Sequence, residues 1–189
     1  MTDRAFETHP LTPERWPDLE DLFGARGASG GCWCMLWRLR KKDWTAGKGD
    51  ANRDALRARV QTAPPPGVLG CLDGRAVGWC SVAPRAEFTG LAGSRILSPV
   101  DDRPVWSVTC FFFRAGFRRK GLSVPLLNAA ADLARDHGAE IVEGYPIDPG
   151  EAKYAASFAW TGFRRTFEAA GFREVARRSE KRPIMRRVL

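Results

Sequence analysis

The sequence contains no long apolar run, since no window of about 18 residues is free of charged side chains. A membrane-spanning helix is therefore not expected. Residues 1–16 also lack the apolar core that a secretory signal peptide needs. We therefore expect a cytoplasmic protein that has no membrane partner.

Histidine and cysteine are also scarce, with two and five residues respectively. The only closely spaced pair, Cys32 and Cys34, is not followed by a second pair at zinc-like spacing, and an odd number does not suit a closed disulfide framework. We therefore expect no metal site and a reducing compartment. Cys71, Cys80 and Cys110 are interpreted as small core residues. Cys110 could act as a nucleophile, but a strand cysteine among apolar residues is usually inert.

What the sequence does contain is an ordinary globular composition with a basic balance. Its 189 residues suit one domain over 1–189, with 44% hydrophobic residues and a formal net charge of +8. Such a charge favours an anionic partner, which could be a nucleic acid, a phosphorylated cofactor or an acidic lipid. Because no recognised nucleic-acid-binding module is present, we expect no nucleic-acid partner.

The hydrophobic periodicity predicts a mixed α/β sheet in the order β, α, α, β, β, β, α, β, α, β, β. Thr12 and Pro13 are expected to begin the first helix, which Pro17 could bend, and Asp73-Gly74 is typical of a hairpin turn. The unit 105–145 is expected to be a parallel strand–helix–strand crossover. The predicted strands are 4–11, the two halves of 67–82, 105–113, 139–147, 173–178 and 182–189, and the helices are 12–24, 49–63, 126–138 and 162–172, with a further short helix around 33–41.

A basic, glycine-containing stretch, FRRKGLS, stands between an apolar strand and the helix that follows it (residues 117–123). The first turn of a helix presents unpaired N–H groups, and Gly121 would let a ligand approach the backbone closely. With three cations beside it, the stretch predicts a site for a pyrophosphate. The alternative interpretation is a basic loop with an ordinary helix cap.

The stretch VTCFFFRAGFRRKGLSVPLLNAAADLARDHGAE (108–140) resembles the acetyl-CoA-binding motif of the GNAT acetyltransferase superfamily. The motif, [QR]-x-x-G-x-[GA], falls on Arg118, Gly121 and Ser123, with Ser in place of Gly or Ala at the last position. Residues 163–189 are similar to the last helix and closing strands of that family. The resemblance implies acetyl-CoA as cosubstrate and a V-shaped split between two neighbouring parallel strands.

In such a fold, pantetheine would pair with the main chain near Phe111 to Phe113, and the pyrophosphate would bind N–H groups of residues 119–124. A main-chain N–H near Phe111 could also stabilise the oxyanion. The residues that the resemblance assigns to the cosubstrate are Phe111, Phe112, Phe113, Arg118, Arg119, Lys120, Gly121, Leu122, Ser123 and Val124.

A general base is not evident on the expected strand, because VWSVTCFFF has no carboxylate. Glu87 and Glu143 are the first candidates for the base that deprotonates the acceptor amine, and Asp101 and Asp102 are further ones.

The family's usual acid is also missing, because Phe167 stands where similar proteins often have tyrosine. Tyr145 is therefore the candidate acid, with Tyr154 as the other phenol. Trp160 replaces a frequent asparagine, which puts the usual side-chain contacts there in doubt.

The acceptor side is expected to involve residues 25–66, where Trp33 and Trp37 are spaced so that one helical face would carry both rings. Such a segment could be core or a lid over a cationic acceptor. The sequence thus predicts an acetyl-CoA-dependent N-acetyltransferase, monomeric or homodimeric, that acts by direct attack of a small-molecule or peptide amine. The alternative is a non-catalytic acyl-CoA-binding sensor.

Overall fold

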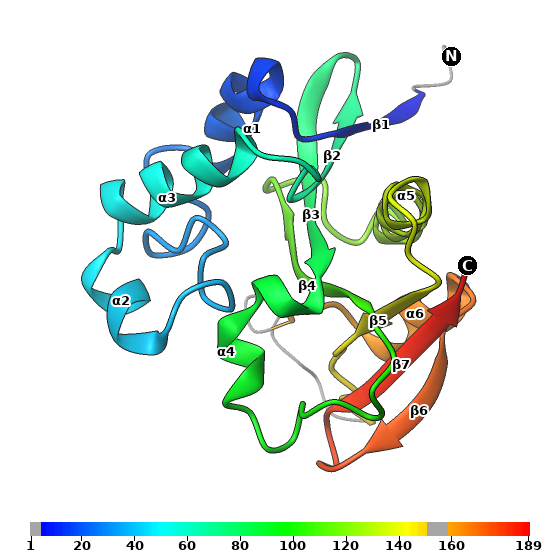
Figure 1. The fold of residues 1–189 in the computed structure, drawn as a ribbon. Coiled ribbons are helices and arrows are strands. Elements are labelled where there is room, and N and C mark those ends of the chain that lie inside the picture. Colours follow the sequence, from blue (N-terminus) through cyan, green and yellow to red (C-terminus); the bar gives the residue numbers. More distant parts are fainter. Residues whose placement is uncertain (1–4, 151–158) are drawn as a thin grey trace.

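The computed structural model describes residues 5–150 and 159–189, and the seven strands of these ranges form one sheet in the order β1-β2-β3-β4-β5-β7-β6 (Figure 1). The strands are β1 (Phe6–Pro10), β2 (Gly67–Leu72), β3 (Arg75–Pro84), β4 (Trp106–Phe113), β5 (Ile141–Gly144), β6 (Arg173–Arg177) and β7 (Pro183–Val188). The α-helices are α1 (Trp16–Phe23), α2 (Lys41–Ala46), α3 (Asp50–Val60), α4 (Thr89–Ala92), α5 (Ser123–Asp136) and α6 (Arg164–Ala169), with 3-10 turns at Pro13–Arg15 and Arg85–Glu87.

The strands and the helices α1, α3, α5 and α6 follow one another in the predicted order, so the predicted mixed α/β sheet is confirmed. The turn between β2 and β3 is formed by Asp73 and Gly74, whose φ angles of 51° and 75° are those of a primed hairpin turn. Across the described ranges, no helix has both the length and the apolar character needed to cross a membrane.

The start of α1 differs from the prediction. Thr12 makes no side-chain cap hydrogen bond, and Pro13–Arg15 form a separate 3-10 turn before the α-helix. Pro17 lies in the first turn of α1, where its missing N–H costs no helical hydrogen bond, so it begins this helix and does not bend it. Gly24, with a φ of 62°, ends the helix as expected.

The helix predicted around residues 33–41 is absent. Trp33 and Cys34 have φ angles of 45° and 58°, in the left-handed region, which no right-handed helix can include. Helix α2 begins only at Lys41. Trp33 and Trp37 therefore do not share a helical face, and their rings contact different partners: Trp33 stacks on Trp16, with centroids 5.9 Å apart, and Trp37 lies beside Trp160.

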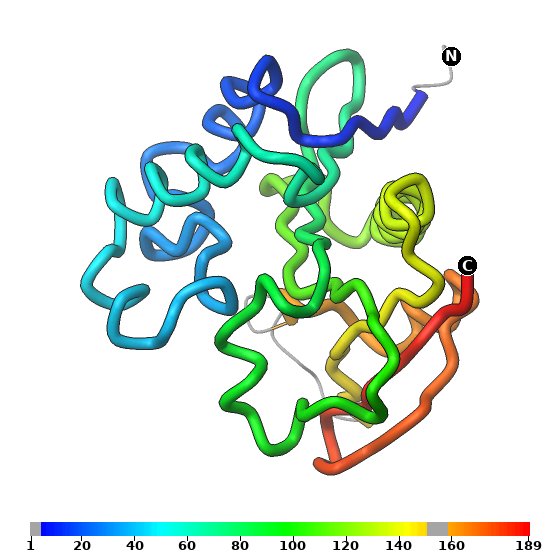
Figure 2. The backbone as a smooth tube through the Cα atoms, viewed as in Figure 1, coloured from blue at the N-terminus to red at the C-terminus, as the bar shows by residue number. Residues whose placement is uncertain are grey.

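The two faces of the sheet carry different helices (Figure 1). Helix α5 packs on β2 and β3 and buries Leu126, Leu127 and Ala130 against them. On the other face lie α1, α3 and the winding segment 25–40, which Figure 2 shows as a folded loop beside α3. The N-terminal part of the chain thus covers one face of the central strands.

Strands β4 and β5 form the parallel pair that was predicted for 105–145, but their pairing is short. Only Trp106–Val108 pair with Val142–Gly144, although β4 continues to Phe113. The register between β3 and β4 also shifts at Thr109, because Ser81 and Val82 lie opposite Cys110 and Val108. Beyond this bulge the two parallel strands separate, which opens the V-shaped split that the resemblance implied.

Candidate active site

Residues 159–163 lie between the end of β4 and the chain that follows β5, and we call them the crossing segment. The Phe111 N–H donates to the Trp160 carbonyl oxygen at 2.6 Å, and the Ile147 N–H donates to the Gly162 carbonyl oxygen at 2.8 Å. One side of the segment is thus bonded to β4 and the other to the chain that follows β5. The N–H expected to serve pantetheine or an oxyanion therefore has a main-chain partner in this conformation.

The three phenylalanines at the end of β4 are not equivalent. The Phe111 N–H points into the split, and the Phe113 carbonyl oxygen accepts a bond of 3.2 Å from Arg118 Nε. Main-chain groups alternate along a strand, so those of Phe112 turn toward β3, where the residue opposite is Trp79. Phe111 and Phe113 are therefore the two whose main-chain groups face away from β3, and in this structure they bond to Trp160 and Arg118.

The loop between β4 and α5 has the shape that an anion site needs. Arg119 and Gly121 have φ angles of 60° and 76°, and α5 begins two residues later at Ser123. A Cβ built on Gly121 would meet no atom within 4 Å, so the space beside this backbone is open. The first-turn N–H groups of the fourteen-residue helix face that end, and N–H groups in such a position can bind an anion.

The cations of the loop are exposed and only loosely held. Arg118 reaches back to the end of β4, and the Lys120 ammonium lies 5.2 Å from the centre of the Phe117 ring. Leu122, Ser123 and Val124 are half-buried at the start of α5. The structure thus brings the predicted phosphate residues together at one helix end, beside the open end of the split.

Glu143 and Tyr145 lie at the base of the split in a buried network. Glu143 has no exposed surface and Tyr145 is 1% exposed. The Tyr145 hydroxyl donates to Glu143 Oε1 at 2.6 Å, and Arg186 Nε donates to Oε2 at 2.7 Å. Arg85 donates to Oε1 at 3.1 Å and also to the tyrosine hydroxyl, which is 2.8 Å from Ser107 Oγ.

This environment favours the protonated phenol. Burial, followed by the neighbouring Glu143 carboxylate, raises the pKa of Tyr145 far above its ordinary value, and the positive charge of Arg85 opposes them only partly. Tyr145 therefore keeps its proton throughout the physiological range. Both oxygens of Glu143 are occupied by hydrogen-bond donors in this conformation.

Glu87 is on the N-terminal side of the sheet, in the 3-10 turn after β3, and its side chain is 26% exposed. Arg59 donates to both of its oxygens at 2.7 and 2.8 Å, and Arg38 donates to Oε2 at 2.7 Å. Partial burial alone would raise the pKa of Glu87, but the two guanidinium groups outweigh it, so the pKa lies below its usual value. The carboxylate is ionised at neutral pH.

The remaining candidates are dispersed. Asp101 accepts a hydrogen bond from Arg186 Nη1 at 2.7 Å, which lowers the pKa of its carboxyl, and Asp102 is exposed beside it. Tyr154 lies outside the described residues. The structure thus joins Glu143 and Tyr145 into one cluster and places Glu87 in a different one.

Sequence reasoning missed the crossing segment. Its one signal was Gly162, which has a φ of 83° and at which a Cβ would lie only 3.0 Å from the Phe167 ring and 3.1 Å from the Phe111 ring. Phe167 is fully buried, and its ring lies 6.1 Å from that of Phe111 at a right angle. The position that holds tyrosine in similar proteins is therefore an apolar contact here.

The sheet thus has two parallel strands that pair over three residues only, with an open glycine loop and the start of α5 after β4. The family model described as the acetyltransferase (GNAT) family matches residues 33–151. The chain belongs to this family, whose members are acyl- and acetyltransferases. A comparison with curated proteins finds no match.

Solved structures share the fold at low sequence identity. PaiA N-acetyltransferase from Thermoplasma acidophilum, in complex with coenzyme A, is 12% identical with a TM-score of 0.54, over 98% of this chain and 99% of that one. YncA from Salmonella typhimurium, a putative acetyltransferase with acetyl-CoA, is 14% identical with a TM-score of 0.52, over 98% and 94%. The aminoglycoside N-acetyltransferase AAC(6')-Iy, in complex with CoA, is 15% identical with a TM-score of 0.55, over 92% and 91%. These similarities concern the fold.

Proposed function

We propose that this protein transfers an acetyl group from acetyl-CoA to an amine of a small molecule or peptide, by direct attack. The observation that carries the proposal is that β4 and β5 pair over three residues only, with the open Gly121 loop following the end of β4. We further propose that residues 1–189 act as a single domain, since the seven described strands form one sheet.

The cosubstrate site that we propose combines the backbone of β4 with the loop. Phe111 and Phe113 offer main-chain groups to pantetheine, and residues 119–124 offer N–H groups to the pyrophosphate. Arg118, Arg119 and Lys120 supply positive charge, and Leu122, Ser123 and Val124 form the first turn. Phe112 contributes from its side chain, which packs on Phe23 with centroids 5.3 Å apart and so holds β4 to α1.

Acetyl-CoA would supply an activated acetyl group, and the chain's own residues must manage the protons. Removing the proton of an alkyl ammonium with a pKa of about 10.4 costs about 4–5 kcal/mol at pH 7. Glu87 is the candidate base with an ionised and partly exposed carboxylate. Glu143 acts through Tyr145, because its carboxylate orients the phenol that we propose as the acid for the leaving thiolate.

We propose that residues 25–66, which pack on one face of the sheet and which we call the cover, form the side of the site where the acceptor binds. Trp37 from this cover meets Trp160 of the crossing segment with ring centroids 6.1 Å apart. The Trp37 carbonyl oxygen also accepts the Gly90 N–H at 2.8 Å, which ties the cover to α4. We propose that the acceptor amine reaches the split past these two rings.

A sensor that binds acyl-CoA without turnover is the second candidate. Two observations favour it: the ring of Phe167 carries no proton to donate, and the Phe111 N–H is already bonded to the crossing segment. Such a protein would bind acetyl-CoA and leave it intact.

One assay separates these functions. Protein is mixed with acetyl-CoA and a panel of amines and amine-bearing peptides, and released free thiol is measured, with acetyl-CoA affinity determined in parallel. Thiol release that depends on both the amine and the protein supports the enzyme. Saturable binding without release for any amine supports the sensor, and absence of binding contradicts both.

A further inference from the structure

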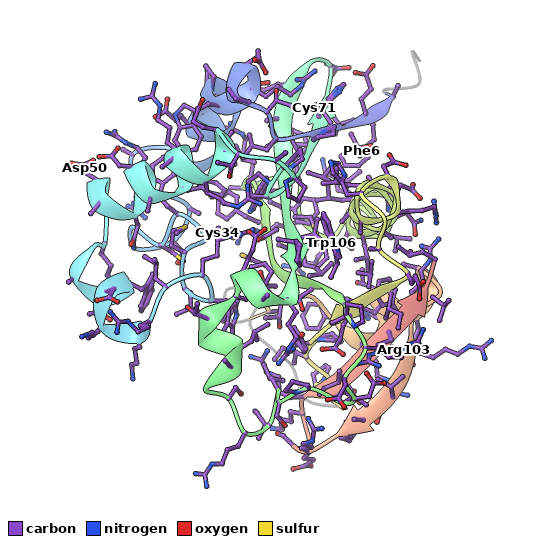
Figure 3. The ribbon with its side chains drawn as sticks, in the orientation of Figure 1. Phe6, Cys34, Asp50, Cys71, Arg103 and Trp106 are labelled. Carbon is purple, nitrogen blue, oxygen red and sulfur yellow. The ribbon has the colours of Figure 1, made fainter. Side chains whose placement is uncertain are left out.

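A cavity of about 560 Å³ lies between the loop that precedes β4 and the strands β5, β6 and β7. Figure 3 shows Arg103, which lines this cavity from the loop, beside β7. The cavity borders Ile141 at the start of β5, whereas the Gly121 loop follows the end of β4. Because β4 and β5 run parallel, the two places lie at opposite ends of this strand pair. We call this space, which lies away from the proposed cosubstrate site, the β6–β7 cavity.

Part of the lining of the β6–β7 cavity is apolar. Val175 from β6 and Val188 from β7 line it, and they are 43% and 72% exposed. Only one other large apolar side chain in the described part of the chain, Ile96, is exposed to this degree. Ile141 lies opposite Val188 in the sheet register and continues the same apolar surface. An organic ligand that covered these side chains would remove apolar surface from water.

Two arginines flank the β6–β7 cavity on the same face of the sheet. Arg173 on β6 lies directly opposite Arg186 on β7, and both line the cavity. Side chains in this relation project from the same face and interact, and like charges placed there repel each other. An anion in the cavity would lie close to both guanidinium groups and would offset this repulsion.

Arg186 is the fixed member of this pair. Its side chain is only 8% exposed, and Nε donates to Glu143 Oε2 at 2.7 Å while Nη1 donates to Asp101 Oδ2 at 2.7 Å. These bonds use two of the five N–H groups of a guanidinium and hold its plane in one orientation. Arg186 therefore needs no reorganisation to interact with a ligand in the cavity.

The other cations of the cavity lack a firm anionic partner. Arg173 is exposed and makes no hydrogen bond or ion pair with another described residue. Arg103 lies 3.8 Å from Glu140, and because both side chains are exposed this pair contributes little to stability. Asp101 already accepts hydrogen bonds on both oxygens, from Arg186 and from the Arg103 main-chain N–H. The cavity therefore carries positive charge that its lining does not balance.

We propose that the β6–β7 cavity binds an organic carboxylate with an apolar body, such as an aromatic acid. The carboxylate interacts with Arg173 and Arg186, and the apolar body covers Val175 and Val188. A cation does not suit this cavity, because Asp101 is the one acidic residue of its lining and both of its oxygens are occupied. The inference goes beyond acetyl transfer and does not depend on it, because none of the residues that contact the carboxylate belongs to the proposed cosubstrate site.

Titration calorimetry of the full chain with naphthoate tests the proposal, and naphthylmethylammonium, which has the same rings and the opposite charge, is the control ligand. We expect saturable binding of the carboxylate and no binding of the ammonium. Arg173→Gln should weaken naphthoate binding at least about tenfold, because a charge-assisted hydrogen bond is lost. Lys181→Gln removes the same charge in the turn between β6 and β7, at the other end of this hairpin, and should bind naphthoate normally.

A second variant tests the apolar part of the cavity. Val188→Asp places a carboxylate on the apolar surface, so it should also weaken naphthoate binding at least about tenfold, and its melting curve should stay cooperative because Val188 is exposed. Loss of affinity in Arg173→Gln and Val188→Asp but not in Lys181→Gln would support the proposal. No saturable binding at millimolar naphthoate, equal binding of the ammonium, or wild-type affinity in either cavity variant would overturn it.

Discussion

At the scale of residues, the site depends on two contrasting environments. Gly121 is exposed, has a left-handed backbone and faces open space, whereas Tyr145 is buried and fully bonded to Glu143, Arg85 and Ser107. The first suits a place that a ligand must enter. The second suits a hydroxyl group that stays protonated and whose O–H bond is oriented by its hydrogen-bond partners.

Replacing Gly121 by Glu should weaken binding of CoA by at least about tenfold, equivalent to about 1.4 kcal/mol, because a carboxylate would stand at the phosphate position. The left-handed φ of 76° adds about 1–2 kcal/mol of backbone strain. Titration calorimetry with CoA measures the effect.

Gly138→Glu is the matched control, since Gly138 has a φ of 80° and open space around it at the opposite end of α5. It should carry the same strain and charge and bind CoA normally. Equal loss of affinity in both variants would mean that the loop is not the phosphate site.

Tyr145→Phe should lower turnover at saturating acetyl-CoA by about 10²–10⁴-fold if the phenol protonates the leaving thiolate. CoA affinity should remain unchanged and serves as the control. Steady-state kinetics with an identified acceptor measures both. Near-normal turnover would remove Tyr145 from the mechanism.

The same residue predicts how stability depends on pH. Because the pKa of Tyr145 is raised on folding, the phenol stabilises the native state fully below the unfolded pKa of about 10, and this contribution is lost as pH rises above it. Denaturant unfolding from pH 8 to 11 should therefore show a steeper loss in the wild type than in Tyr145→Phe. Parallel curves would contradict the buried, protonated assignment.

At the scale of elements, the sequence predicted what local chemistry determines. Periodicity and the Asp73-Gly74 turn identified the strands and α3. The basic glycine stretch indicated the junction between β4 and α5, but α5 begins at Ser123, before the predicted start at residue 126. The failures arose where tertiary contacts override local preference. Trp33 and Cys34 have left-handed angles where the buried Trp33 ring packs on Trp16, a contact that no local sequence pattern reveals.

The crossing segment is the element that sequence could not locate, because its hydrogen bonds join Trp160 and Gly162 to partners far away in the chain.

A substitution in the crossing segment tests its role. Trp160→Ala removes the ring contact with Trp37, so the segment should release the Phe111 N–H more readily and CoA affinity should increase several-fold. Titration calorimetry with CoA measures the affinity of the variant and of the wild type. A lower affinity in the variant would contradict this prediction and show that Trp160 itself contacts the ligand.

At the scale of the whole molecule, the sheet lies between two layers, helix α5 on one face and the N-terminal segments on the other (Figure 1). The net charge of +8 suits the several phosphate charges of CoA. In our proposal the acceptor meets the cover, and no hydrophobic periodicity predicts the winding path of its residues 25–40.

The central claim, that this chain uses acetyl-CoA at the β4–α5 loop, is tested most directly by thermal unfolding with and without the cosubstrate. Acetyl-CoA at about 100 times its dissociation constant should stabilise the wild type by about 2.7 kcal/mol and so raise its melting temperature, with little effect on Gly121→Glu. An unchanged melting temperature of the folded wild type at millimolar acetyl-CoA would contradict the claim.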